Sequence, residues 1–141
     1  MNWTIEVIVI PVSDVDRAKE FYHDKMGFNV DIDTQHGPSR IVQITPPGSG
    51  CSLTLMSSPE GAGGPGMSPG TLRGVQLVVA DLKAAHAQLS ERGVAVSDIQ
   101  VFGPEGPRPY RDGDDLNNVG FCYFDDPDGN GWAIQQMADR S

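Results

Sequence analysis

Hydrophobic and polar residues follow one another in a pattern that predicts a strand and then a helix at the start of the chain. Residues 5–10 are mostly β-branched, which is typical of a buried strand. Asp14 supplies an N-terminal helix signal, and the helix is expected to continue to about Met26 and to end at Gly27. The first 27 residues therefore predict a β-α unit.

Three further strands are predicted before residue 57. Phe28, Val30 and Ile32 alternate with polar residues, so this strand has one face in water. Strands near 39–45 and 51–56 follow, separated by a run rich in proline and glycine. The order of elements in this part of the chain is βαβββ.

The same order returns after a segment without periodicity. Residues 57–70 are rich in glycine, proline and serine, which is typical of a flexible linker. Beyond it, the run Val79-Ala80-Asp81-Leu82 repeats the earlier run Val12-Ser13-Asp14-Val15. A second helix is expected at about 82–92.

Strands near 94–102, 119–124 and 131–137 complete a second βαβββ module. We therefore expect a single α+β domain over residues 1–141. It consists of module 1 (1–56), the linker (57–70) and module 2 (71–141).

Composition narrows the function classes. A chain of 141 residues is the size of one compact domain, and its net charge of −9 argues against nucleic-acid binding. Such a charge attracts cationic small molecules or only maintains solubility. No apolar run approaches the ~20 residues that cross a bilayer, and the start of the chain lacks a secretory pattern. Cys51 and Cys122 form no CxxC motif, so we expect reduced thiols and a cytoplasmic location.

Two motifs carry a family resemblance. The run VSDVDRAKEFYHDKMGF (12–28) and the run DDPDGNGWAI (125–134), together with the two βαβββ modules, resemble the vicinal oxygen chelate superfamily. That superfamily includes glyoxalase I, extradiol dioxygenases, fosfomycin-resistance enzymes and bleomycin-resistance proteins. The resemblance implies two curled mixed sheets that enclose a cleft for metal and substrate.

The resemblance also identifies four positions that hold the metal in metal-binding relatives. Counting from the two motifs places them at Val7, Thr54, Gly74 and Ala133. Three of these residues have no side-chain donor atom, and a neutral threonine hydroxyl is a poor ligand for zinc or iron. The sequence therefore predicts a member of the family without metal or other cofactor.

A face without metal ligands suits an organic molecule. The rigid turn at 126–131 is expected to fix the final strand, whose inward face would present a small residue, an amide and a thioether. Residues of the same parity on other strands are apolar or neutral, which is typical of ligand pockets. The expected lining consists of Val7, Thr54, Met56, Gln76, Ala133, Gln135 and Met137.

The long connection 103–118 adds Tyr110 and Arg111 to the candidate ligand-binding residues. Long connections are often functional, and this one could act as a lid in which Tyr110 stacks on the ligand. The alternative is a solvated insertion held by its prolines. The sequence leaves both interpretations open.

The resemblance implies metal-independent binding of a small organic molecule, as in the bleomycin-resistance branch, where sequestration of a drug gives antibiotic resistance. The alternative is an enzyme of the same fold, either a glyoxalase-like lyase or isomerase or a dioxygenase. The linker 57–70 is long enough for modules to be exchanged between chains, so we also expect a homodimer.

The substitutions at Val7, Gly74 and Ala133 generate a first prediction. We expect protein purified without a histidine tag to contain no stoichiometric zinc, iron, manganese or nickel, because these positions offer no donor atoms. Elemental analysis before and after dialysis against a chelator measures this. One transition metal per chain that resists the chelator would contradict the prediction.

Overall fold

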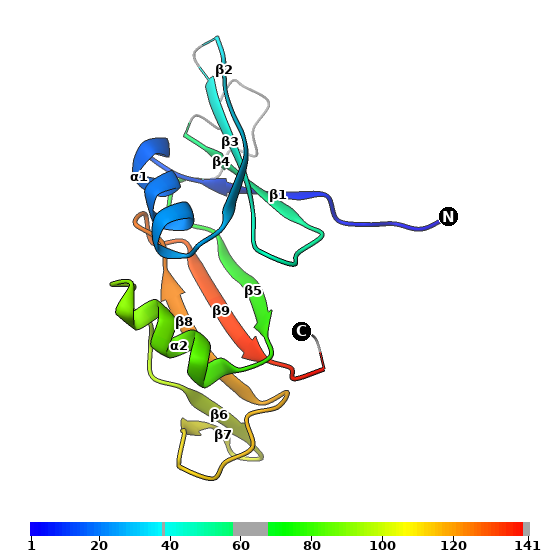
Figure 1. Ribbon diagram of the computed structural model, residues 1–141, viewed down its shortest axis with the longest axis vertical. Helices are drawn as coiled ribbons and strands as arrows, with labels where there is room; N and C mark the ends of the chain where they lie inside the picture. Colours follow the sequence, from blue (N-terminus) through cyan, green and yellow to red (C-terminus); the bar gives the residue numbers. More distant parts are fainter. Residues whose placement is uncertain (38, 58–67, 140–141) are drawn as a thin grey trace. The chain divides into compact units, whose positions relative to one another are not determined.

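A computed structural model describes residues 1–37, 39–57 and 68–139 (Figure 1). The chain forms two compact units. The first consists of Met1–Leu72 and Asp126–Asn130, and the second of Arg73–Asp125 and Gly131–Ser141. The short segment 126–130 thus belongs to the first unit, although both its neighbours along the chain belong to the second.

The first unit contains a four-stranded mixed sheet and one helical segment. In the sheet, β1 is parallel to β4, and the remaining neighbours are antiparallel, in the order β1-β4-β3-β2. The strands are β1 (Val7–Pro11), β2 (Asn29–His36), β3 (Ser39–Thr45) and β4 (Ser52–Met56). Between β1 and β2 lie α1 (Val15–Lys19) and its continuation η1 (Glu20–Lys25).

The helical segment begins at the expected cap and changes form halfway. The carboxylate of Asp14 accepts a hydrogen bond from the Arg17 amide at 3.1 Å, which caps the first turn. From Glu20 the helix widens to a π-helix, and the Met26 amide donates to the Phe21 carbonyl at 3.0 Å. The expected extent of this helix is confirmed, and both aromatic residues of η1, Phe21 and Tyr22, are buried.

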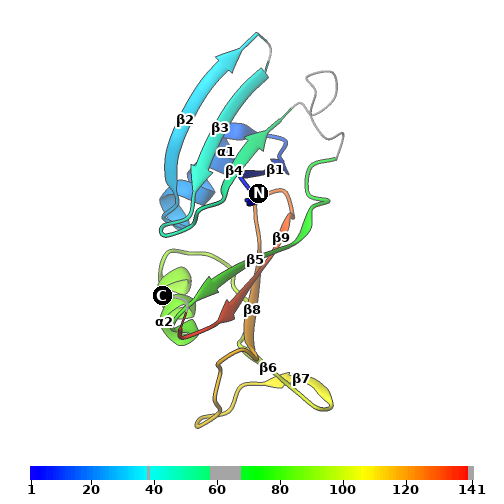
Figure 2. The same cartoon turned by 90° about the vertical axis from the view of Figure 1, so that its right-hand side faces the viewer.

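The second unit repeats this arrangement with one addition. Its sheet has the order β5-β9-β8-β6-β7, and β5 is parallel to β9 (Figure 2). The strands are β5 (Arg73–Val79), β6 (Gln100–Gly103), β7 (Gly106–Pro109), β8 (Gly120–Asp125) and β9 (Gly131–Gln136). Helix α2 (Leu82–Glu91) follows β5 and is capped by Asp81, which accepts from the Ala84 amide at 3.0 Å. Without β7, the strand order matches that of the first sheet, so the predicted α+β fold class is confirmed.

The second unit differs from the expected pattern at one strand and at one connection. The strand expected near 94–102 begins only at Gln100, and the chain before it is hydrogen-bonded to β8 through Ser97. There Ser97 donates its amide to the Tyr123 carbonyl at 2.8 Å, while its hydroxyl accepts from the Tyr123 amide at 2.9 Å. The connection 103–118 contains a short strand, β7, that the sequence pattern did not predict. Two prolines in β7 suit its place at the sheet edge, where an amide donor is not needed.

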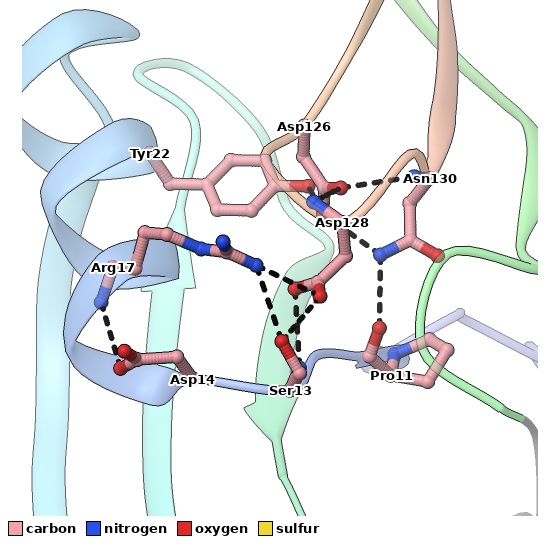
Figure 3. Close-up of polar contacts among 8 residues, drawn as sticks. All are labelled: Pro11, Ser13, Asp14, Arg17, Tyr22, Asp126, Asp128 and Asn130. Atoms are coloured by element: carbon pink, nitrogen blue, oxygen red, sulfur yellow. Dashed lines mark hydrogen bonds and ion pairs between the residues drawn. The ribbon is translucent and has the colours of Figure 1, made fainter.

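The segment 126–130 is held in the first unit by a buried hydrogen-bond network (Figure 3). The hydroxyl of Tyr22 donates to the Asp126 carboxylate at 2.7 Å. The side-chain amide of Asn130 donates to the same carboxylate at 2.8 Å and to the Pro11 carbonyl at 2.9 Å. Asp126 and Asn130 are 5% and 1% exposed, so these bonds satisfy groups that water does not reach.

A second carboxylate attaches the segment to the beginning of the helix. Asp128 accepts from the amide and the hydroxyl of Ser13, and from the Arg17 guanidinium at 3.0 Å (Figure 3). The side chain of Asp128 is only 6% exposed. Asp126 and Asp128, which the sequence pattern assigns to a turn, therefore also bond to η1 and α1.

The network generates a stability prediction. Asn130→Ala removes three side-chain hydrogen bonds, and it leaves the Pro11 carbonyl and the Leu72 amide without their partner. We expect a loss of about 2–4 kcal/mol in the free energy of unfolding, because each buried polar group that loses its partner costs about 1–3 kcal/mol. Urea denaturation followed by circular dichroism measures this.

Asn29→Ala is the matched control, because this residue is exposed and, among the described residues, its side-chain amide bonds to the exposed Asp31 carboxylate alone. It should change the free energy of unfolding by less than about 0.5 kcal/mol. Equal effects of the two substitutions would show that the network does not stabilise the first unit.

Candidate ligand-binding site

The second sheet has one covered face and one open face. Helix α2 packs on β8 and β9, and the residues beneath it are buried. On β9, Trp132 and Ile134 point to this covered face, and they are 3% and 2% exposed. Because successive strand residues alternate, Ala133 and Gln135 point to the opposite face. The predicted parity of the final strand is therefore confirmed.

A row of aromatic side chains crosses the open face. Tyr123 pairs with Ala133, and Phe121 pairs with Gln135 in the β8–β9 register, so these rings share the face of Ala133 and Gln135. The ring centroids of Phe121 and Tyr123 are 6.5 Å apart, and the two planes are nearly parallel at 9°. Phe102 of β6 meets Phe121 edge-on at 5.2 Å. Phe102 and Tyr123 are 40% and 36% exposed, which is unusual for such large apolar rings.

These three aromatic residues were not among those predicted from the sequence. Strand parity was considered for β1, β4, β5 and β9 but not for β6 and β8. The signal was present, because Phe121 and Tyr123 alternate with Cys122 and Phe124, which lie on the covered face. Pairing the expected strand 119–124 with 131–137 would have placed both rings beside Ala133.

One end of this face is hollowed into a pocket of about 340 Å³. Ala133 and Tyr123 line it where their strands pair, and Gly74 of β5 lies beside them. The complete lining consists of Arg73, Gly74, Tyr123, Asp125, Gly131, Trp132 and Ala133. The hollow therefore lies at Gly74 and Ala133. These are the two positions of the second unit that correspond to metal ligands in the metal-binding relatives.

The residues at these positions do not fit a transition metal. Gly74 interrupts the regular register between Arg73 and Val75 and has a φ of 90°, a conformation that side-chain-bearing residues rarely adopt. A histidine there would have to overcome backbone strain as well as supply a donor. Across the described ranges 1–37, 39–57 and 68–139, no three His, Cys, Asp or Glu side chains are grouped in a way that could hold a metal ion.

Gln76 and Gln135 lie together on the open face, as expected, but they bond to each other. The side-chain amide of Gln76 donates to the Gln135 oxygen, and the Gln135 amide donates to the Asn118 carbonyl at 2.9 Å. Gln135 is 7% exposed, whereas Gln76 is exposed. Both ends of the Gln135 amide group therefore have partners inside the protein. Met137 follows β9 and donates its backbone amide to Val79.

Tyr110 and Arg111 do not line the hollow. The Tyr110 amide donates to the Ile99 carbonyl at 3.0 Å, and the Nζ atom of Lys83 lies 5.3 Å from the centroid of the Tyr110 ring. This cation–π contact joins Tyr110 to α2. The proposed lid role of Tyr110 and Arg111 stays a prediction.

The connection that carries these residues is held by one ion pair. Two guanidinium nitrogens of Arg108 donate to the Asp114 carboxylate at 2.8 and 3.0 Å. This guanidinium, assisted by the Arg111 amide, lowers the pKa of Asp114 to about 2. The pair therefore persists in acid until the pH approaches 2.

The remaining candidate residues lie on the first sheet. Val7 and Thr54 share a face, because Val9 pairs with Thr54 in the parallel β1–β4 register. Met56 is on the same face of β4. Val7 is 40% exposed, whereas Thr54 is 8% exposed. The structure thus groups the candidates by sheet, three on the first sheet and the others in the second unit.

Comparison with known proteins identifies a family. Residues 4–134 match the model of the Glyoxalase/Bleomycin resistance protein/Dioxygenase superfamily. Among curated proteins, none matches the chain closely enough to count as a relative. No helix in the described part of the chain is long and apolar enough to cross a membrane.

Solved structures of similar proteins share the fold over nearly the full chain. TnmS3, described as an antibiotic binding protein from Streptomyces sp. CB03234, is 34% identical with a TM-score of 0.73, covering 96% of this chain and 97% of its own. A glyoxalase/bleomycin resistance protein from the same organism is 33% identical with a TM-score of 0.70, covering 94% and 100%. A superfamily member from Sphaerobacter thermophilus DSM 20745 is 28% identical with a TM-score of 0.73, covering 96% and 98%.

The bonds of Gln135 generate a prediction for this site. Gln135→Leu should lower the free energy of unfolding by about 1–3 kcal/mol, because the Asn118 carbonyl and the Gln76 amide lose their partner. Asn118 also has a positive φ of 66°, so its turn depends on such support. Thermal and urea denaturation measure the loss. Gln88→Leu, at an exposed position of α2, is the control and should be nearly neutral.

Proposed function

Since the chain belongs to the Glyoxalase/Bleomycin resistance protein/Dioxygenase superfamily, we propose that it binds a small, flat organic molecule without the help of a metal. The observation that carries this proposal is the exposed aromatic row beside the hollow at Ala133. Phe102, Phe121 and Tyr123 present ring faces or edges that a flat ligand can stack against.

The dimensions of the site support stacking. Aromatic pairs attract one another at centroid distances of about 4.5–7 Å and contribute about 0.5–1.5 kcal/mol beyond the apolar area they bury. Tyr123 and Ala133 are paired neighbours on β8 and β9 and share one face, so a ring lying over Ala133 would lie beside Tyr123. The small Ala133 side chain leaves the hollow open for such a ring.

The comparisons support a drug-like ligand. TnmS3 is described as an antibiotic binding protein, and at 34% identity over 96% of this chain it is a relative whose ligand class is a reasonable guide. We therefore propose sequestration of an antibiotic, which would confer resistance without chemical change to the drug.

An enzymatic role has weaker support. Proton transfer in the hollow would fall to Tyr123 and Asp125, because the other lining residues are apolar, glycine or arginine. The Asp125 side chain is 60% exposed, and Tyr123 is 36% exposed. Catalytic groups gain their strength in sites that exclude water, so this arrangement favours binding.

We also propose that the protein forms a homodimer. The described N-terminal residues alternate between polar and large apolar side chains, and the apolar ones are strongly exposed. Trp3 is 88% exposed and Ile5 is 68% exposed, and Val7 continues the series at 40%. Exposed apolar residues that line up in this way are typical of a surface that another chain covers.

The proposed site generates a binding prediction. Ala133→Trp should fill the hollow and abolish binding, so the concentration of an antibiotic needed to raise the melting temperature should increase at least tenfold. The ligand would first be found by a thermal-shift screen of planar and non-planar antibiotics. Isothermal titration calorimetry then compares the variants.

Ala87→Trp is the matched control, because Ala87 is an exposed residue of α2, which covers the opposite face. It should bind the antibiotic as the unmodified protein does. If Ala133→Trp also binds normally, the open face of the second sheet is not the binding site.

A further inference from the structure

The guanidinium of Arg73 lies across the first residue of β9. A Cβ atom added to Gly131 would lie 2.6 Å from the Nη1 atom of Arg73, so any side chain there would displace the guanidinium. Gly131 is not among the glycines with a positive φ, unlike Gly129, whose φ is 99°. Gly131 is therefore not required by a left-handed backbone conformation, although it belongs to the turn predicted at 126–131. Its missing side chain makes room for Arg73.

The Arg73 guanidinium has almost no partner within the described residues. Its Nη1 atom lies 3.7 Å from the Asp125 carboxylate, which is too long for a hydrogen bond, and both side chains are more than half exposed. Arg108, by contrast, makes two short bonds to Asp114. An exposed ion pair without a hydrogen bond contributes little to the free energy of unfolding. The contact with Asp125 therefore does not account for an arginine at position 73.

Arg73 also borders the hollow that Tyr123 and Ala133 line. A planar guanidinium offers five donors in a fixed fork, and it can bind two oxygens of one carboxylate or sulfonate group at the same time. We propose that Arg73 recognises an anionic group on the aromatic ligand, so that the site selects flat aromatic acids over their neutral analogues. This inference rests on the proposed function and specifies the class of ligand.

The net charge of −9 does not oppose this selection at the site itself. The hollow is lined by one cationic residue, Arg73, and one anionic residue, Asp125. Distant surface charges are screened within about 8 Å at physiological salt, whereas a group in contact with Arg73 is not screened. An incoming anion would take the position that Asp125 holds loosely at 3.7 Å.

Two fluorescent probes with the same ring system test the proposal. One is 1-anilinonaphthalene-8-sulfonate, and the other is N-phenyl-1-naphthylamine, which lacks the sulfonate. We expect the unmodified protein to bind the sulfonate probe more tightly. Arg73→Met should weaken binding of the sulfonate probe roughly tenfold or more and leave the neutral probe within about twofold, because only the charge-assisted bonds are lost.

Gly131→Ala tests the position of the guanidinium without removing its charge. It should lower the ratio of the affinity for the sulfonate probe to the affinity for the neutral probe severalfold. The double variant with Arg73→Met should have the same ratio as Arg73→Met alone, because both substitutions act through the same guanidinium. Arg92→Met, which removes a charge after α2, is the control for net charge and should leave the ratio unchanged. Melting curves exclude probe binding to unfolded protein.

The outcomes separate the two proposals. If neither probe binds, or if Phe121→Ala leaves binding of both unchanged, the aromatic site itself is wrong. If both probes bind in a manner that depends on Phe121 but Arg73→Met does not change their affinity ratio, the site stands and the recognition of an anion by Arg73 is wrong. Tighter binding of the sulfonate probe by Arg73→Met would also overturn it.

Discussion

The buried carboxylate of Asp126 accepts four hydrogen bonds, and the geometry of the final hairpin depends on them. Two come from side chains, the Tyr22 hydroxyl and the Asn130 amide, and two from the backbone amides of Asp128 and Asn130. A buried carboxylate without such partners would destabilise the fold by several kcal/mol. The network therefore fixes the conformation of 126–130, and with it the residue at which β9 begins.

The position of that first residue determines which side chains face the hollow. Because β9 begins at Gly131, strand alternation places Trp132 and Ile134 beneath α2 and Ala133 and Gln135 on the open face. A shift of one residue would exchange the two sets and bury the amide under the helix. The segment 126–130 would thus affect the proposed ligand binding only indirectly, through the register of one strand, because none of its residues lines the hollow.

Much of the fold could be predicted from local signals. The duplicated order of elements, the caps at Asp14 and Asp81 and the parity of the final strand depend on residues close in sequence. The features that were missed depend on residues far apart. The aromatic row requires the pairing of β8 with β9 and of β6 with β8, and the reason for Gly131 is a side chain at residue 73. Likewise, the sequence does not show that the side-chain amide of Gln135 bonds to Gln76 and to the Asn118 carbonyl. Without these partners in view, the amide would be expected to bond to a ligand.

The central claim is that the open face of the second sheet binds a flat aromatic molecule. The most direct test is a nuclear magnetic resonance titration of isotopically labelled protein with N-phenyl-1-naphthylamine, following every backbone amide. The account predicts that the largest shifts occur in β8 and β9, at Phe121, Tyr123 and Ala133, with little change in α2. Shifts confined to α2 or to strands of the first sheet would contradict it.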